Sequence, residues 1–151
     1  MSKCLVIMVD TENVSPKCIE SLKSMTDYIY PTFQNVGIFC FGMEDGKSGT
    51  SEGWKRLVKE RCDKSLHWQP VDGPRVKNKV DRAICDKVAQ FMDIPKFSRI
   101  DVWVIATSDG DFKSAIKCIK DHGHRAVIAS DTPASSKLIE MCDVFYRLWT
   151  K

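Results

Sequence analysis

The residues 101-DVWVIATSDGDFKSAIKCIKDHG-123 join a strand-like run to a helical pattern through a turn that holds two aspartates. The run at 101–106 is short, apolar and rich in β-branched residues, which is typical of a buried strand. Apolar residues then recur at helical spacing, namely Phe112, Ala115, Ile116 and Ile119. Gly123 marks the end of that pattern. The stretch therefore predicts a buried strand, an acidic turn and an amphipathic helix in succession.

The same alternation runs along the whole chain. Strand-like runs occupy residues 4–9, 35–41, 66–71, 101–106, 125–130 and 144–149. Helical patterns occupy residues 16–29, 51–62, 79–92, 111–122 and 133–142, the last with Thr132 and Pro133 as its start signal. This alternation predicts a doubly wound, three-layer α/β domain with right-handed crossovers and a mainly parallel sheet. We expect the strand order 3-2-1-4-5, with the final run as a candidate sixth strand.

Length and composition limit the class of protein. The chain has 151 residues, 43% hydrophobic and 28% charged, so we expect one domain over residues 1–151. No apolar run approaches the roughly 18–20 residues that span a bilayer, and the N-terminal run indicates a first strand rather than a signal peptide, so no membrane partner is expected. Seven cysteines without a CxxC pair predict free thiols in a reducing, cytoplasmic setting. The net charge of only +3 means that a nucleic-acid surface requires local clustering of cations.

Four aspartates are expected at one edge of the sheet, because turns that follow parallel strands lie at its carboxyl edge. They are Asp10, Asp81, Asp109 and Asp111. In the expected strand order, Asp10 and Asp109 flank the crevice where that order reverses. Clustered carboxylates repel one another unless a cation neutralises them, and hard divalent ions prefer such oxygen ligands. The pattern therefore predicts a site for Mg²⁺ or Mn²⁺ that holds one ion or two.

Local structural roles are the alternative for these acids. Asp111 could cap its helix, and Asp10 could form an Asx-turn with the amide of residue 12 or 13. Convergence of all four acids on one edge favours the metal site over this alternative. Asn13, in 10-DTEN-13, could orient Asp10 or a metal-bound water.

Basic residues surround the predicted acidic edge. Those that we expect to bind a substrate backbone are Arg75, Lys77, Lys79, Arg82 and Lys113. Lysine and arginine beside a metal site suit the phosphates of a nucleic acid. The alternative is an ordinary solvated face, although 75-RVKNKVDR-82 runs directly into Asp81.

Several motifs together resemble the NYN domain (LabA-like) branch of the PIN-like nucleases. They are VDTEN at the end of the first strand, KNKVDRAICDKV on a middle helix, VWVIATSDGDFKSAI, and the closing GHRAVIASDTPASSKLIEMCDVFYRL. The resemblance covers almost the whole chain in the right order. It implies a PIN-like Rossmannoid fold and metal-dependent hydrolysis of RNA, most often endonucleolytic.

Carried over by motif, the resemblance assigns the acidic set to Asp10, Asp81, Asp109 and Asp111, with Asn13 as a helper. Asp86 also matches a recurring acid, but it lies about 140° round a helix from Asp81. Asp143 matches as well, and we interpret it as structural. The segment 42–53 has no counterpart in the resemblance and could shape substrate choice.

Rival functions come from other classes. A phosphate-loop NTPase would need four residues between the glycines of 42-GMEDGKS-48, and only three are present. An acid-pocket phosphatase would need paired aspartates after the first strand, where the chain has Asp-Thr-Glu. The main alternative is a non-catalytic RNA- or protein-binding module on the same fold. The RNA target and the oligomeric state, monomer or homodimer, stay open at this point.

Overall fold

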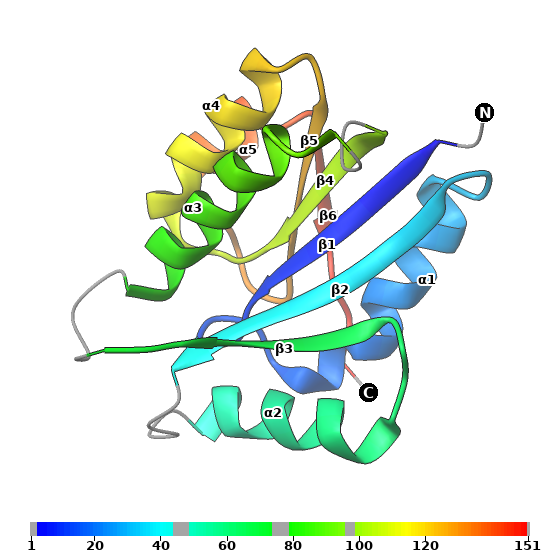
Figure 1. The fold of residues 1–151 in the computed structure, drawn as a ribbon, viewed down its shortest axis with the longest axis vertical. Helices are drawn as coiled ribbons and strands as arrows, with labels where there is room; N and C mark the ends of the chain where they lie inside the picture. Colours follow the sequence, from blue (N-terminus) through cyan, green and yellow to red (C-terminus); the bar gives the residue numbers. More distant parts are fainter. Residues whose placement is uncertain (1–2, 44–48, 74–78, 96–98, 151) are drawn as a thin grey trace.

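A parallel sheet forms the centre of the protein (Figure 1). The structure is a computed structural model that describes residues 3–43, 49–73, 79–95 and 99–150. The strands are β1 (Cys4–Asp10), β2 (Gln34–Met43), β3 (Leu66–Val71), β4 (Ile100–Ala106), β5 (Arg125–Ser130) and β6 (Val144–Arg147). All neighbouring pairs are parallel, in the order β3-β2-β1-β4-β5-β6. The predicted order and the sixth strand are confirmed.

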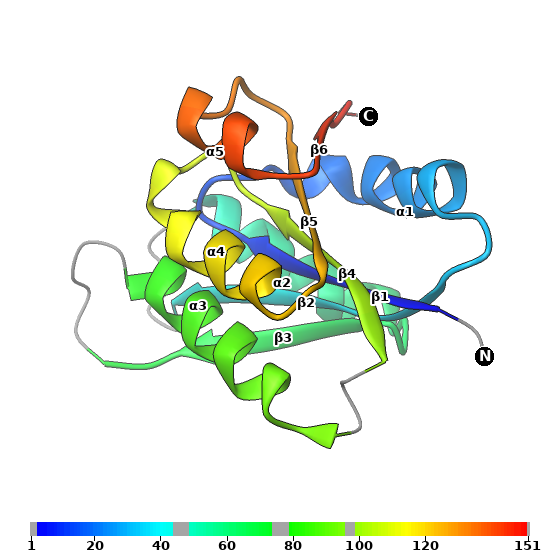
Figure 2. The same ribbon diagram turned by 90° about the horizontal axis from the view of Figure 1, so that it is seen from above.

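Helices cover both faces of this sheet. They are α1 (Ile19–Ile29), α2 (Gly49–Arg61), α3 (Lys79–Met92), α4 (Lys113–Asp121) and α5 (Ser136–Met141), with the 3₁₀ turns η1 (Pro16–Cys18) and η3 (Gly110–Phe112). Figure 1 shows α3, α4 and α5 together on one face and α1 and α2 on the other, and Figure 2 shows α1 and α4 on opposite sides of the strands. The three-layer architecture is therefore confirmed. Among the described residues, no helix is both long and apolar enough to cross a membrane.

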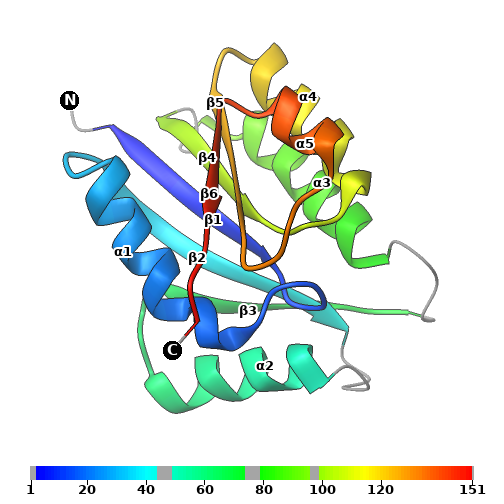
Figure 3. The same cartoon turned by 180° about the vertical axis from the view of Figure 1, so that it is seen from behind.

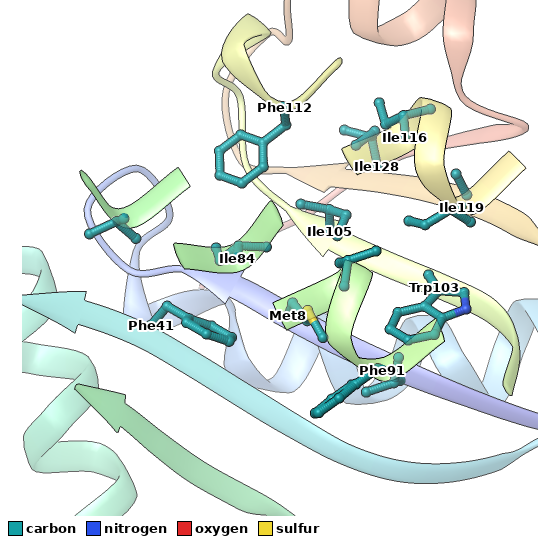
Figure 4. Close-up of a cluster of buried hydrophobic side chains, with 14 of the residues drawn as sticks. Met8, Phe41, Ile84, Phe91, Trp103, Ile105, Phe112, Ile116, Ile119 and Ile128 are labelled. Atoms are coloured by element: carbon teal, nitrogen blue, oxygen red, sulfur yellow. The ribbon is translucent and has the colours of Figure 1, made fainter. Parts of the chain in front are cut away.

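Apolar cores on both faces of the sheet explain why the sequences of the central strands are continuously hydrophobic. Met8 of β1 and Trp103 of β4 point into the core beneath α3 and α4, where Figure 4 shows them close to Ile84 and Ile119. The alternate residues of β1 and β4, such as Val104, point into the core beneath α1 and α2. Every residue of β1 is buried, as expected for a strand covered on both faces.

The bounds of four helices differ from the sequence prediction, and α2 spans Gly49–Arg61 rather than residues 51–62. Both α1 and α4 begin with a 3₁₀ turn, capped by the side chains of Ser15 and Asp109 respectively. The last helix begins at Ser136 rather than at residue 133. A polar turn holds the preceding chain, because Thr132 N–H donates to Ser130 Oγ (3.1 Å), and Ser135 is the residue directly before the helix.

The residues after β6 lie beside α1, as Figure 3 shows from behind. There Trp149 N–H donates a hydrogen bond to the buried Ser21 Oγ (3.1 Å), and Leu148 N–H donates to Ser130 O (2.8 Å). These bonds attach the C-terminal segment to the first helix and to the end of β5. The edge of the sheet at β6 is thus held on the α1 side.

We expect Phe112→Ala to lower the free energy of unfolding by about 3–5 kcal/mol, because Phe112 is fully buried where η3 meets the core. Tyr28→Ala is the matched control, since Tyr28 is 83% exposed on α1 and its loss should change stability by no more than about 0.5 kcal/mol. Urea denaturation measures both. Equal losses in the two variants would contradict the packing described for Phe112.

Candidate active site

Three aspartates meet at the carboxyl edge of the sheet. Asp81 lies in the first turn of α3, and Asp109 and Asp111 lie in the turn between β4 and α4. One carboxylate oxygen from each lies within 4.8 Å of the others, a spacing that could hold a metal ion. The set runs from buried Asp81 through half-buried Asp109 to exposed Asp111. The cluster therefore presents acids at three depths.

Asp10 lies behind this cluster at the end of β1 and is only 2% exposed. Its Oδ2 accepts hydrogen bonds from Asn13 Nδ2 (2.6 Å) and from Thr107 Oγ1 (2.9 Å). Asp10, Asp81 and Asp109 line one cavity of about 110 Å³, whose wall also includes Asn13. The structure thus brings all four predicted acids to one place, with Asp10 on the inner wall rather than within the three-oxygen cluster.

Of the two local structural roles considered as an alternative, the Asx-turn of Asp10 is present and the cap by Asp111 is not. The Asp10 carboxylate also accepts a hydrogen bond from the backbone N–H of Glu12, which is the Asx-turn interaction. The helix cap is Asp109 rather than Asp111, because Asp109 Oδ1 accepts from the N–H of Asp111 (2.9 Å). The alternative in which Asp111 caps its helix is therefore wrong. Because the 3₁₀ turn η3 begins at Gly110, Asp109 is the residue that precedes it and caps it. Asp111 lies inside this turn, and its side chain is exposed.

Burial dominates the electrostatics of the two inner acids. It raises the pKa of Asp10 to about 6, although hydrogen bonds from Asn13 and Thr107 act in the opposite direction. Burial also raises the pKa of Asp81, and the negative charges of Asp109 and Asp111 raise it further. Neighbouring carboxylates with raised pKa values would be stabilised by a bound cation.

Thr107 is the part of this site that sequence reasoning missed. It is fully buried, its Oγ1 donates to Asp10, and the same oxygen accepts from the N–H of Asp109 (3.1 Å). One hydroxyl group therefore links the end of β1 to the turn after β4. The available signal was its position directly after the apolar run of the strand that neighbours β1.

A second cavity opens outward from the cluster. It has a volume of about 350 Å³, and its lining includes Asp81, Asp111 and Asp86. The exposed Asp86 thus borders the site despite its angular offset on α3. Asp143 lies at the opposite edge of the sheet, where its Oδ2 accepts from the N–H of Ala126 at the start of β5 (2.8 Å).

The predicted cations lie at different distances from the acids. Lys79 is half-buried and lines the cavity of about 110 Å³ beside Asp10, the inner cavity. Arg82 is exposed and lines the cavity of about 350 Å³ beside Asp111, the outer cavity. Lys113 is the exposed first residue of α4, directly after η3. Arg75 and Lys77 lie outside the described residues. Of the five predicted contacts, the structure therefore brings Lys79 and Arg82 to the cavities and Lys113 to the adjoining turn.

A six-stranded parallel sheet that carries carboxylates at its order reversal is consistent with an α/β domain of PIN-like fold. The family model of the NYN domain matches residues 5–148, and the chain belongs to this family within the PIN-like nuclease superfamily. No curated protein sequence matches the chain. The predicted family is therefore confirmed over nearly the whole chain.

In metal-free solution, we expect Asp10→Asn to stabilise the folded protein above neutral pH. The folded pKa of about 6 exceeds the ordinary value of 3.8, so the folded state holds this proton more tightly than the unfolded state. Wild-type stability should therefore fall, through this residue, as pH rises from about 4 to 7. The variant should be more stable at pH 8 by roughly 2–3 kcal/mol, and equal or less stable at pH 4.

Urea denaturation at pH 4, 6 and 8 in EDTA measures this difference. Asp63→Asn is a control of opposite sign, because a hydrogen bond from Lys23 (2.6 Å) lowers the pKa of Asp63. That variant should lose stability at neutral pH. A stability difference between wild type and Asp10→Asn that does not change with pH would contradict the assignment of a buried, weakly acidic carboxyl group to Asp10.

Proposed function

We propose that this NYN domain protein is a metal-dependent ribonuclease that hydrolyses RNA phosphodiester bonds endonucleolytically. The observation that carries the proposal is the convergence of Asp81, Asp109 and Asp111 within 4.8 Å, beside the cavity that Asp10 lines. Family membership supports a nuclease activity. All seven cysteines are free thiols, which fits action in the reducing cytoplasm.

The donor set suits Mg²⁺ or Mn²⁺. These ions prefer carboxylate oxygens, and the cluster offers one oxygen from each of three aspartates without a sulfur or imidazole ligand among them. Burial raises the pKa values of Asp10 and Asp81, so a cation would relieve an existing electrostatic cost. When bound, a divalent ion supplies a water of lowered pKa and neutralises charge on the phosphoryl and leaving oxygens.

The chain's own residues then have separate tasks. Asp81, Asp109 and Asp111 would hold the ion, and Asp10 would complete the site from its inner wall. Asn13 and Thr107 would fix the rotamer of Asp10, because both donate hydrogen bonds to its Oδ2. The exposed position of Asp111 leaves one side of the cluster accessible to a substrate.

The cations beside the acids would bind the RNA backbone without reading its sequence. Lys79 would contact a phosphate next to the inner cavity, and Arg82 and Lys113 would contact phosphates on its outer side. Arg75 and Lys77 are proposed to extend this surface. Such contacts carry affinity and position the strand.

We expect purified protein to cleave end-labelled RNA in Mg²⁺ or Mn²⁺ and not in EDTA. Asp81→Asn and Asp109→Asn should each lower the rate by on the order of 100-fold or more, because each removes an anionic oxygen from the cluster. Asp121→Asn is the control, an exposed acid of α4 that pairs with Lys117 (2.7 Å). Undiminished cleavage in EDTA, or full activity of Asp109→Asn, would contradict the proposal.

A second measurement tests the RNA surface. The double variant Lys79→Ala, Lys113→Ala should bind RNA more weakly and reduce the slope of log K against log salt by roughly two units, about one for each lost contact. Binding is measured in EDTA by fluorescence anisotropy at several salt concentrations. Lys59→Ala, an exposed lysine of α2 on the other face of the sheet, should leave the slope unchanged. An unchanged slope in the double variant would place the RNA elsewhere.

A further inference from the structure

Helix α2 is hydrogen-bonded to the turn that presents Asp10 and Asn13. Thr11 Oγ1 donates to Phe41 O (2.6 Å), and it lies 2.6 Å from Ser51 Oγ in the first turns of α2. Both hydroxyl groups are buried. A threonine hydroxyl has one proton, and Phe41 O accepts it, so Ser51 must be the donor to Thr11. The two side chains thus form a directed chain from α2 to β2.

The same helix holds the other end of the turn. Trp54 Nε1 donates to Val14 O (2.6 Å), and the Trp54 side chain is fully buried. The anchored residues Thr11 and Val14 flank Glu12 and Asn13, which line the inner cavity. Two buried hydrogen bonds from α2 therefore hold the turn on both sides of the residues that face the acids, one at the Thr11 side chain and one at the Val14 backbone.

Gly42 provides the space for this arrangement. A Cβ atom on Gly42 would lie 2.5 Å from the Trp68 ring, 2.6 Å from Thr11 Oγ1 and 3.2 Å from Ser51 Oγ. Any larger residue would push the hydroxyl pair apart. The close approach of β2 to the turn is therefore part of the same construction.

We propose that Ser51 and Trp54 are positioning residues for the acidic site, acting through Thr11 and Val14. Asn13 is exposed, and its Nδ2 reaches Asp10 Oδ2 (2.6 Å) only while the turn keeps its path. The other three acids are carried by α3 and the β4–α4 turn, on the opposite face from α2. Helix α2 thus sets the position of one half of the site relative to the other. The catalytic part of this inference rests on the proposed function.

The test compares Ser51→Ala with Ser21→Ala. Ser21 is also fully buried and also hydrogen-bonded, to the N–H of Trp149, but it does not contact the turn. Both variants should lose similar stability. Only Ser51→Ala should accelerate hydrogen exchange of the Asn13 N–H, which donates to Asp10 O (3.1 Å), by about fivefold, as expected for one lost buried hydrogen bond.

Only Ser51→Ala should also weaken Mn²⁺ binding, measured by isothermal titration calorimetry, and lower kcat for RNA cleavage, each by about tenfold. Thr11→Val and Thr11→Ser form a second pair, because the first removes the hydroxyl group at nearly constant volume and the second retains it. Thr11→Val should behave like Ser51→Ala, and Thr11→Ser should recover most of the Mn²⁺ affinity. Trp54→Phe should likewise accelerate exchange near Val14.

The outcomes separate this inference from the proposed function. Equal Mn²⁺ affinity, exchange and kcat in Ser51→Ala and Ser21→Ala would show that the hydroxyl pair is structural only, and would overturn the inference. A wild-type protein that neither binds Mn²⁺ nor cleaves RNA would overturn the proposed function and, with it, the catalytic role of α2. In that case the exchange of the Asn13 N–H still decides whether α2 holds the turn.

Discussion

The buried carboxylate of Asp10 is the constraint around which the carboxyl edge of the sheet is organised. It ends the central strand β1 and is almost without solvent contact, so its ionised form needs compensation from neighbouring groups. That compensation comes from three donors: Asn13 and the N–H of Glu12 in its own turn, and Thr107, the residue directly after β4. These donors do not suffice, because the pKa of Asp10 stays near 6. The remaining electrostatic cost is what a bound cation would remove.

The reversal of strand order explains why these donors come from distant parts of the chain. β1 pairs with β2 on one side and with β4 on the other. Helix α1 precedes β2 and helix α3 precedes β4, and these two helices lie on opposite faces of the sheet. On the β2 side, Thr11 and Ser51 join the turn to α2. On the β4 side, Thr107 joins Asp10 to the turn that carries Asp109. Hydrogen bonds on the β2 side and on the β4 side therefore hold the chain around one carboxylate.

Sequence reasoning predicts the parts of this arrangement that follow from periodicity. Alternating apolar runs and helical patterns predict a doubly wound parallel sheet and the edge on which the acids gather, and the structure agrees with both. Side-chain hydrogen bonds between distant segments have no such periodic signal. Thr107 and Ser51 look like ordinary hydroxyl residues until the register of β1 with β4 and the packing of α2 are known.

Local cap chemistry also limited the sequence prediction. Either aspartate of 109-DGD-111 can cap a helix, and only the length of the first turn decides between them. In the structure a 3₁₀ turn precedes α4, which makes Asp109 the cap and leaves Asp111 exposed. The start of α5 also differs from the sequence prediction. A polar turn precedes α5, because Thr132 N–H donates to Ser130 Oγ, and the helix begins only at Ser136.

The depth of the four acids gives the site a direction. Asp10 and Asp81 are buried, Asp109 is half-buried and Asp111 is exposed, so the cost of carrying a negative charge falls from the inner wall outward. A bound cation would stabilise the buried carboxylates of Asp10 and Asp81 most. The exposed carboxylate of Asp111 would lose least when solvent or a phosphate shares the cation. A hydrated ion and an RNA strand would therefore approach from the side of Asp111. On that side lie the outer cavity, Arg82 and the first residue of α4. In the proposed function, the buried end of the acid series holds the ion in place and its exposed end meets the substrate.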